Sequence, residues 1–368
     1  MDDRVDSSQQ MPRELSPRRV GRRLIELAVV VAIVALVVVL GPGLGAVRGD
    51  IAHASAIWLL VAVGSEVLSA LSYVVIFRSV FCQKMGWGLS YQIGMAEQGA
   101  NSVLSVSGTG GLALGAWALH RGGMSTEHIG RRTVAFFLLT SLANVWTLIV
   151  FAVLFAVGVF PYDRNPITYA VAGAGLLATL VVVLGLPRLR RRDAPREPGT
   201  GTRWSKLKAA LRFARNSLGD GVRDGLVMVR RRPISILGGS FGTMGFDLAA
   251  LAMCFKAFGH SPPVAVLVVA YLIGQLGGNI PVPGGLFGLD AGLIGVFVLY
   301  HQPLAVSTAA VLIYHAISLW VPGLLGSLAF VQLRRTLQRD SQMAALCAPL
   351  AESLETVQLP VAAGAGRS

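Results

Sequence analysis

The stretch that decides the fold is residues 264–299, VAVLVVAYLIGQLGGNIPVPGGLFGLDAGLIGVFVL. It is strongly apolar, but NIPVPGG at 279–285 interrupts its centre. Proline removes a backbone donor and clashes inside a helix, and glycine costs about 1 kcal/mol relative to alanine. Such backbone is tolerated at membrane depth only where protein or a water-filled cavity covers it. The stretch therefore predicts a broken hydrophobic hairpin inside a larger membrane bundle.

The composition around this stretch is that of a membrane protein. Of 368 residues, 54% are hydrophobic and only 14% are charged, whereas a soluble chain carries about a quarter charged residues. Leu24–Leu40 and Val134–Val159 contain no Lys or Arg, and each is long enough to cross about 30 Å of hydrocarbon as a helix. The net charge of +13 lies chiefly in loops, so it indicates membrane topology and not nucleic-acid binding. We expect an all-α integral membrane fold.

Six full spans and two broken segments are predicted along the chain. The first broken segment, about 91–119, is interrupted by SGTGG at 107–111, and the second is 264–299. The expected spans are about 24–44, 55–77, 133–158, 167–186, 234–258 and 304–330.

Basic residues flank the first broken segment on both sides, so the positive-inside rule keeps both of its ends in the cytoplasm. The second broken segment lies between charge-poor loops at 259–263 and 301–303. Two re-entrant hairpins that enter from opposite faces leave no basic cluster misplaced. The basic residues are Arg78, Lys84, Arg121, Arg131 and Arg132.

These elements form an inverted repeat, because span, hairpin and span recur with opposite orientation in the second half. Inverted repeats with broken helices near the midplane are the usual plan of secondary transporters.

The loop at 187–233 is either an ordinary positive-inside loop or a helix on anionic lipid. The expected order is a basic cytoplasmic N-terminus at 1–23, membrane halves at 24–186 and 234–333 separated by that cytoplasmic loop, and a cytoplasmic tail at 334–368 compatible with disorder.

Acidic residues at membrane depth are the main candidates for function. Glu66, Asp247 and Asp290 would each cost about 2.5–3.5 kcal/mol if charged and unpaired, so such residues usually face a cavity and have a function. No Lys or Arg lies deep enough in the spans to pair with them. Each acid is either neutral and hydrogen-bonded in the bundle, or faces water, a cation or His315. Histidine changes charge near neutral pH, which makes His315 a candidate proton carrier or a hydrogen-bonding bundle residue.

The glycine turns offer the complementary chemistry. A helix that starts at the midplane presents free N–H groups that suit phosphate, and glycine lets a ligand approach the backbone closely. The same glycines could instead serve only helix packing, and the asparagines could satisfy broken backbone. Our hypothesis is a lipid head-group groove between the repeats. Its candidate substrate-binding residues are Glu66, Asn101, Gly110, Gly111, Asp247, Asn279, Pro281, Pro283, Gly284, Gly285, Asp290 and His315.

Residues 277–286, Asp290, Tyr314-His315 and WVPG at 320–323 resemble the lysylphosphatidylglycerol synthase transmembrane-region family, also called flippase-like integral membrane proteins. The segment from Asn101 to Gly122 is similar to the "NxxLP…GG…RxG" region in the first half of the family's sequences. The whole resemblance covers roughly residues 20–335. Departures are Asp290 where the family usually has Glu, His315 where it has Arg, and Ser105 where Pro is common. The soluble aminoacyl-transferase domain of some relatives is not expected here.

This resemblance implies the handling of polar lipids. We expect a lipid flippase that moves a polar or glycosylated lipid between leaflets of the cytoplasmic membrane. The alternatives are a non-transporting scaffold for a glycosyltransferase or lipid-modifying enzyme, and an intramembrane enzyme that uses Asp290 and His315. No enzyme motif, cofactor or metal site is expected. The expected partners are membrane lipids, with a membrane enzyme partner or homo-oligomer also compatible with the sequence.

Overall fold

The computed structural model describes Gly49 and residues 54–103, 110–159, 166–180, 219–278 and 286–339, which form helices and turns without a strand. Four helices are long and apolar enough to cross a membrane: α4 (Ala56–Phe81), α7 (Thr126–Ala156), α10 (Pro233–Ala257) and α13 (Leu304–Arg339). They confirm the all-α membrane fold and match four of the six predicted spans. Helix α8 (Pro166–Leu180) covers the described part of a fifth, and the span at 24–44 lies outside the described residues.

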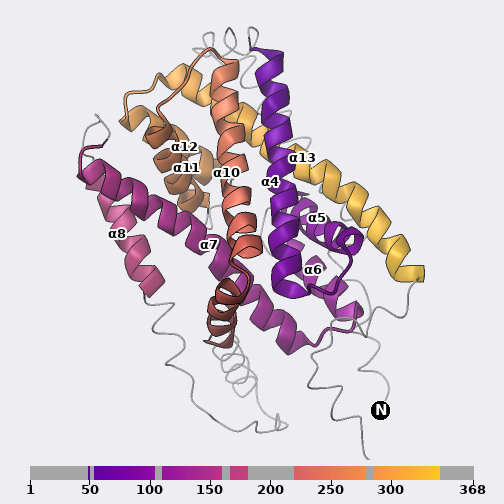
Figure 1. The fold of residues 1–368 in the computed structure, drawn as a ribbon. Coiled ribbons are helices and arrows are strands. Elements are labelled where there is room, and N and C mark those ends of the chain that lie inside the picture. Colours follow the sequence, from indigo (N-terminus) through magenta and orange to yellow (C-terminus); the bar gives the residue numbers. More distant parts are fainter. Residues whose placement is uncertain are drawn as a thin grey trace, which may run out of the picture.

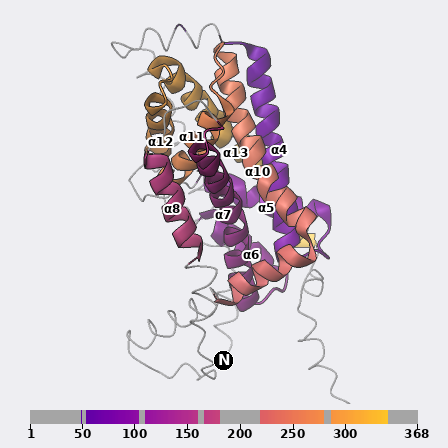
Figure 2. The ribbon, with the colours of Figure 1, turned by 60° about the vertical axis from the view of Figure 1, so that its left-hand side comes forward.

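Helices α4 and α10 run antiparallel along their whole length at the centre of the bundle (Figures 1 and 2). At one end the Ser55 N–H donates to the Ala257 carbonyl at 2.8 Å. Further along, the Ser69 hydroxyl donates to the Thr243 carbonyl at 2.9 Å. Near the other end, a Cβ on Gly239 would lie 2.8 Å from the Cβ of Ile76. Small residues thus let the two backbones approach closely, as is usual where helices pack in membranes.

Two pairs of short helices flank this central pair. The first is α5 (Trp87–Val103) with α6 (Gly110–Arg121), and the second is α11 (Val264–Gly278) with α12 (Leu286–Leu299). Helix α11 has 15 residues and α12 has 14, so each is about 21–23 Å long. Neither could cross about 30 Å of hydrocarbon alone.

The outer ends of each short pair lie at the same end of the bundle. Before α11 and after α12, the His260 imidazole is hydrogen-bonded to the Gln302 side chain at 3.1 Å. Before α5, the Arg78 guanidinium donates to the carbonyls of Gln83 and Met85. Met85 packs in one apolar cluster with Met124, which follows α6. Each short pair is therefore a hairpin.

The apolar core is divided into two large clusters, one around each hairpin. The first joins α11 and α12 to the ends of α7 and α10 and to the first part of α13, with Phe255, Phe297 and Val311 fully buried. The second joins α5 and α6 to the end of α4, the start of α7 and the end of α13, with Phe77 and Leu333 fully buried. Because α7 and α13 contribute to both clusters, they tie the two hairpins into one bundle.

The helix order long, short, short, long occurs twice. Helices α10, α11, α12 and α13 each begin 176 to 178 residues after α4, α5, α6 and α7, respectively.

Local sequence signals set several of the helix boundaries. Ser125 caps α7 by accepting a hydrogen bond from the His128 N–H, and Pro233 occupies the first turn of α10. Gly259, with φ +68°, provides the left-handed turn after α10.

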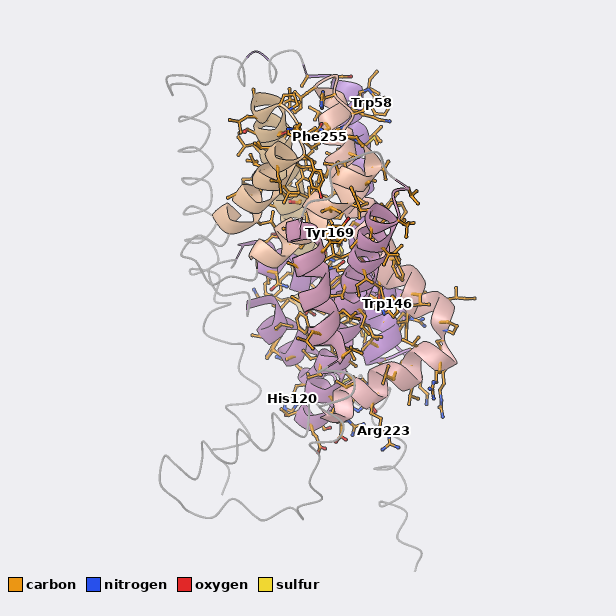
Figure 3. All side chains as sticks on the ribbon, turned by 90° about the vertical axis from the view of Figure 1, so that its left-hand side faces the viewer. Trp58, His120, Trp146, Tyr169, Arg223 and Phe255 are labelled. Atoms are coloured by element: carbon orange, nitrogen blue, oxygen red, sulfur yellow. The ribbon has the colours of Figure 1, made fainter. Side chains whose placement is uncertain are left out.

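Basic side chains gather at one end of the bundle. His120 and Arg223 lie at this end, whereas Trp58 and Phe255 lie at the other (Figure 3). The helical residues 219–231 pack here, where Arg131 donates to Asp224 at 2.9 Å. The described end of the basic loop is thus attached to α7, while the rest of that loop lies outside the described residues.

The crossing of α5 and α13 gives a stability prediction. A Cβ on Gly326 would lie 2.5 Å from the Gly99 Cα and would also collide with the Met95 carbonyl, so the substitution Gly326→Ala must push two backbones apart. We expect it to lower the free energy of unfolding by about 1–3 kcal/mol, measured by thermal unfolding in detergent. The control is Gly238→Ala, where nothing lies within 4 Å of the added Cβ. Equal stability of the two variants would contradict the close crossing.

Candidate functional site

A polar cluster lies in the apolar interior where α10 meets α11 and α13. Asp247 of α10 accepts two hydrogen bonds from tyrosines. The Tyr271 hydroxyl donates to its Oδ2 at 2.6 Å, and the Tyr314 hydroxyl donates to its Oδ1 at 2.8 Å. Both tyrosines are buried in the surrounding apolar cluster. Short bonds from hydroxyl groups to both oxygens are typical of an ionised carboxylate.

Glu66 of α4 completes the cluster. Its carboxyl group is hydrogen-bonded to that of Asp247 across the central helix pair. Glu66 is only 6% exposed, and its Oε2 receives no hydrogen bond. Glu66 lies near the middle of the predicted span 55–77 and Asp247 near the middle of 234–258, and the structure brings the two acids into direct contact.

The cluster extends further along two helices. Tyr271 is also hydrogen-bonded to Gln275, one turn later on α11. The Cys254 thiol of α10 is buried and close enough to both carboxyl groups to interact with them electrostatically. Four helices contribute to this cluster, and each polar group that they bury in the apolar bundle must be compensated by a partner.

A second polar pair joins the other two helices of this half. His315 of α13 contacts Asp290 of α12, with 2.9 Å between Nδ1 and Oδ1. Their side chains are 18% and 16% exposed, respectively, so the pair is more open than the Asp247 cluster. The His315 Nε2 is buried and has no hydrogen-bond partner among the described residues. Because Tyr314 and His315 are adjacent on α13, one helix holds both polar sites.

The first hairpin contains a related arrangement. Tyr73 of α4 is hydrogen-bonded to Glu97 of α5, and both are buried. Asn101, one turn after Glu97, accepts a hydrogen bond from the Gly111 N–H at 3.0 Å. A Cβ on Gly111 would collide with Asn101 and with the Glu97 carbonyl. Gly111 therefore packs α6 against α5, and Asn101 accepts a hydrogen bond from a free N–H at the start of α6. This is the interpretation in which the glycines serve helix packing and the asparagines satisfy broken backbone.

The candidate residues thus fall into three groups. The structure pairs Glu66 with Asp247, Asp290 with His315, and Asn101 with Gly111, while Gly110 begins α6. The remaining candidates lie outside the described residues: Asn279, Pro281, Pro283, Gly284 and Gly285. In the described ranges, no group of three His, Cys, Asp or Glu side chains could hold a metal ion.

Sequence reasoning missed Tyr73, Glu97, Tyr271 and Tyr314. A signal for three of them was present in the spacing. Tyr271 follows its partner Asp247 by 24 residues, and Glu97 follows its partner Tyr73 by the same interval. Each half therefore joins its first long helix to its first short helix by an acid–phenol bond, with the two residue types exchanged.

Comparisons with known proteins agree with this architecture. The family model described as "Lysylphosphatidylglycerol synthase TM region" matches residues 23–326. A "UPF0104 membrane protein" of Methanothermobacter thermautotrophicus is 26% identical over 207 residues, which is 54% of this chain and 55% of that protein. The chain therefore spans about half the length of this curated relative. Because the family model covers most of the chain, the protein belongs to the lysylphosphatidylglycerol synthase TM region family.

Proposed function

We propose that the protein is a transporter that moves a polar or glycosylated lipid between the leaflets of the cytoplasmic membrane, and that it is not an enzyme. The observation that carries the proposal is the Asp290–His315 pair. Charged side chains at membrane depth are costly and commonly mark substrate pathways. The pair is partly exposed, and no described residue bonds the buried His315 Nε2, so a ligand that enters when the bundle opens could bind there.

The chemistry of the pair suits a lipid head group. The Asp290 carboxylate would attract an amine or accept hydrogen bonds from sugar hydroxyls. The His315 imidazole would bind a phosphate oxygen when protonated. Asp290 lies five residues into α12, near a helix start that also favours anions. A head group bound at this pair would replace the hydrogen bonds that it loses on leaving water.

The bundle geometry supports transport over a purely structural role. We infer that the α5–α6 and α11–α12 pairs are re-entrant hairpins of an inverted repeat, because each has both ends on one side and α4 runs antiparallel to α10. The basic end of the bundle would face the cytoplasm under the positive-inside rule. That orientation puts the second hairpin on the outer side, so a path between the hairpins would connect the two leaflets.

The test compares the lipids that co-purify with the wild-type protein and with the substitution Asp290→Ala. We expect one lipid class, identified by mass spectrometry, to be enriched on the wild type and reduced about 10-fold or more on the variant, since a charged hydrogen bond is worth about 1.5–3 kcal/mol. The matched control is Ser327→Ala on the same helix. Ser327 is exposed and bonds only to the Gly323 carbonyl of its own helix.

Identical, unselective lipid on all three proteins would reject the Asp290 site and favour the scaffold alternative. A chemically altered lipid formed by the purified wild type would instead favour the intramembrane enzyme.

A further inference from the structure

The two carboxyl groups at the centre of the bundle cannot both be ionised and remain hydrogen-bonded to each other. One proton must lie between Glu66 and Asp247. Both oxygens of Asp247 already accept hydrogen bonds from Tyr271 and Tyr314, so Asp247 is the acceptor. Glu66 is therefore the carboxyl group that holds the proton. Pairs of this kind titrate as a unit and not as two independent groups.

No positively charged side chain in the described part of the chain compensates the pair. Within the described parts of the chain, neither carboxyl forms an ion pair with Lys, Arg or His. The titratable groups that face it are Tyr271 from α11, Tyr314 from α13 and Cys254 from α10. Helix α7 contributes apolar residues, among them Leu148 and Ala152, to the cluster around it. Among the described residues, the negative charge that remains on Asp247 has no cationic partner, so a second proton or a bound cation would be needed to neutralise it.

The Glu66 carboxyl group is almost fully buried. It is only 6% exposed, and no described residue donates a hydrogen bond to its Oε2. A carboxyl oxygen that receives no hydrogen bond is suited to carry a proton and to donate it, here to the Asp247 carboxylate. Water that reached the pair when the bundle opened would give this proton a route to leave.

The position of the pair connects proton release to helix movement. Glu66 and Asp247 lie where the two halves meet, on the antiparallel helices that the Ser69–Thr243 bond also joins. If Glu66 lost its proton in the closed bundle, two negative charges would be in contact in a low-dielectric interior, which strongly favours separation. Protonation closes this contact, and deprotonation favours a state in which α4 and α10 part and admit water.

We propose that Glu66 and Asp247 form a proton-binding carboxyl pair that couples a proton gradient to transport, an inference that rests on the proposed lipid movement. The proton is carried on the Glu66 carboxyl group, with Asp247 as its acceptor. It enters or leaves through water on the side to which the two halves open. One proton would be taken up and released in each cycle, and no ATP-binding segment is then needed to drive the protein.

The first experiment tests proton binding without a lipid substrate. N,N′-dicyclohexylcarbodiimide reacts with protonated carboxyl groups in apolar surroundings, and mass spectrometry locates the adduct. We expect Glu66 of the wild type to be labelled near neutral pH and to lose labelling as the pH rises. In the variant Asp247→Asn, labelling should disappear at a lower pH, because the neighbouring negative charge that favours the proton has been removed. Glu66→Gln defines the background.

An unlabelled Glu66, or an adduct on Asp247 in its place, would overturn this placement of the proton. A folded state of each variant is verified by its gel-filtration profile in detergent. If Glu66→Gln does not fold, Glu66→Asp provides a second variant, in which the shorter side chain should retain the proton but alter the pH range of labelling.

The second experiment tests coupling. Vesicles of phosphatidylethanolamine and phosphatidylglycerol that contain the full chain carry a short-chain fluorescent phosphatidylglycerol as the probe. We expect an imposed pH gradient to accelerate transbilayer movement of the probe by the wild type and to have no effect on Glu66→Gln. Equal movement with and without the gradient would overturn coupling but leave transport intact. Acceleration by a sodium gradient alone would replace the proton with sodium. Absence of movement under every condition would reject the transport of this probe and with it the coupling, while labelled Glu66 would still demonstrate proton binding.

Discussion

Replacing both Tyr271 and Tyr314 with phenylalanine is expected to lower the free energy of unfolding by about 3–6 kcal/mol. Each substitution removes one hydrogen bond to a buried carboxylate, and a bond to a charged group is worth about 1.5–3 kcal/mol. Phenylalanine keeps the ring volume, so no large cavity is formed. The loss therefore comes from Asp247, whose two oxygens would no longer have hydroxyl donors. Unfolding in detergent mixtures of increasing denaturing power measures the difference.

A control for this prediction is available on α8. The Tyr169 hydroxyl is buried but has no hydrogen-bond partner in the described part of the chain, so Tyr169→Phe should leave stability unchanged or raise it slightly. Adding Asp247→Asn to the Tyr271→Phe/Tyr314→Phe protein should recover part of the loss, because a neutral amide costs less to bury than a carboxylate. If the double variant is as stable as Tyr169→Phe, Asp247 is not the ionised acceptor that its geometry indicates.

The spans and the order of elements could be predicted because hydropathy and charge determine them directly. The predicted spans 55–77 and 234–258 coincide with α4 and α10 within a few residues at most ends, since lipid requires an apolar surface around every helix. The charge pattern predicted that both ends of each broken segment lie on the same side of the membrane, and the His260–Gln302 contact joins the two outer ends of the second one. The orientation of the bundle in the membrane stays a prediction.

The site was predictable only in part. An acid in an apolar span is conspicuous, so Glu66, Asp247 and Asp290 were found, and His315 was the one cationic partner that the sequence offered to Asp290. The contact between Glu66 and Asp247 was not foreseen, because it depends on how α4 crosses α10. Tyrosines such as Tyr271 are ordinary in apolar helices, and nothing in their immediate surroundings distinguishes a hydrogen-bond donor to a carboxylate from a packing residue.

The substitution His315→Leu is expected to slow transbilayer movement of the fluorescent phosphatidylglycerol probe by about 10- to 100-fold. Leucine removes the partner of Asp290 and leaves a partly buried carboxylate uncompensated. Loss of a charge-assisted hydrogen bond costs about 1.5–3 kcal/mol, and 1.4 kcal/mol corresponds to a factor of ten. It also removes Nε2, which no described residue bonds and which we propose binds a phosphate oxygen. The measurement is the rate at which the probe changes leaflet in vesicles containing each variant.

His315→Arg separates the charge of this residue from its shape. A guanidinium can pair with a carboxylate through two parallel hydrogen bonds and retain further donors for phosphate, so this variant should keep most of the wild-type rate. Ser318→Ala is the local control, because the Ser318 hydroxyl donates to the His315 backbone carbonyl and not to its ring. Equal loss with leucine and arginine would mean that the imidazole shape is required. A wild-type rate with leucine would reduce the Asp290–His315 pair to a structural contact and remove the observation on which lipid transport through this site is based.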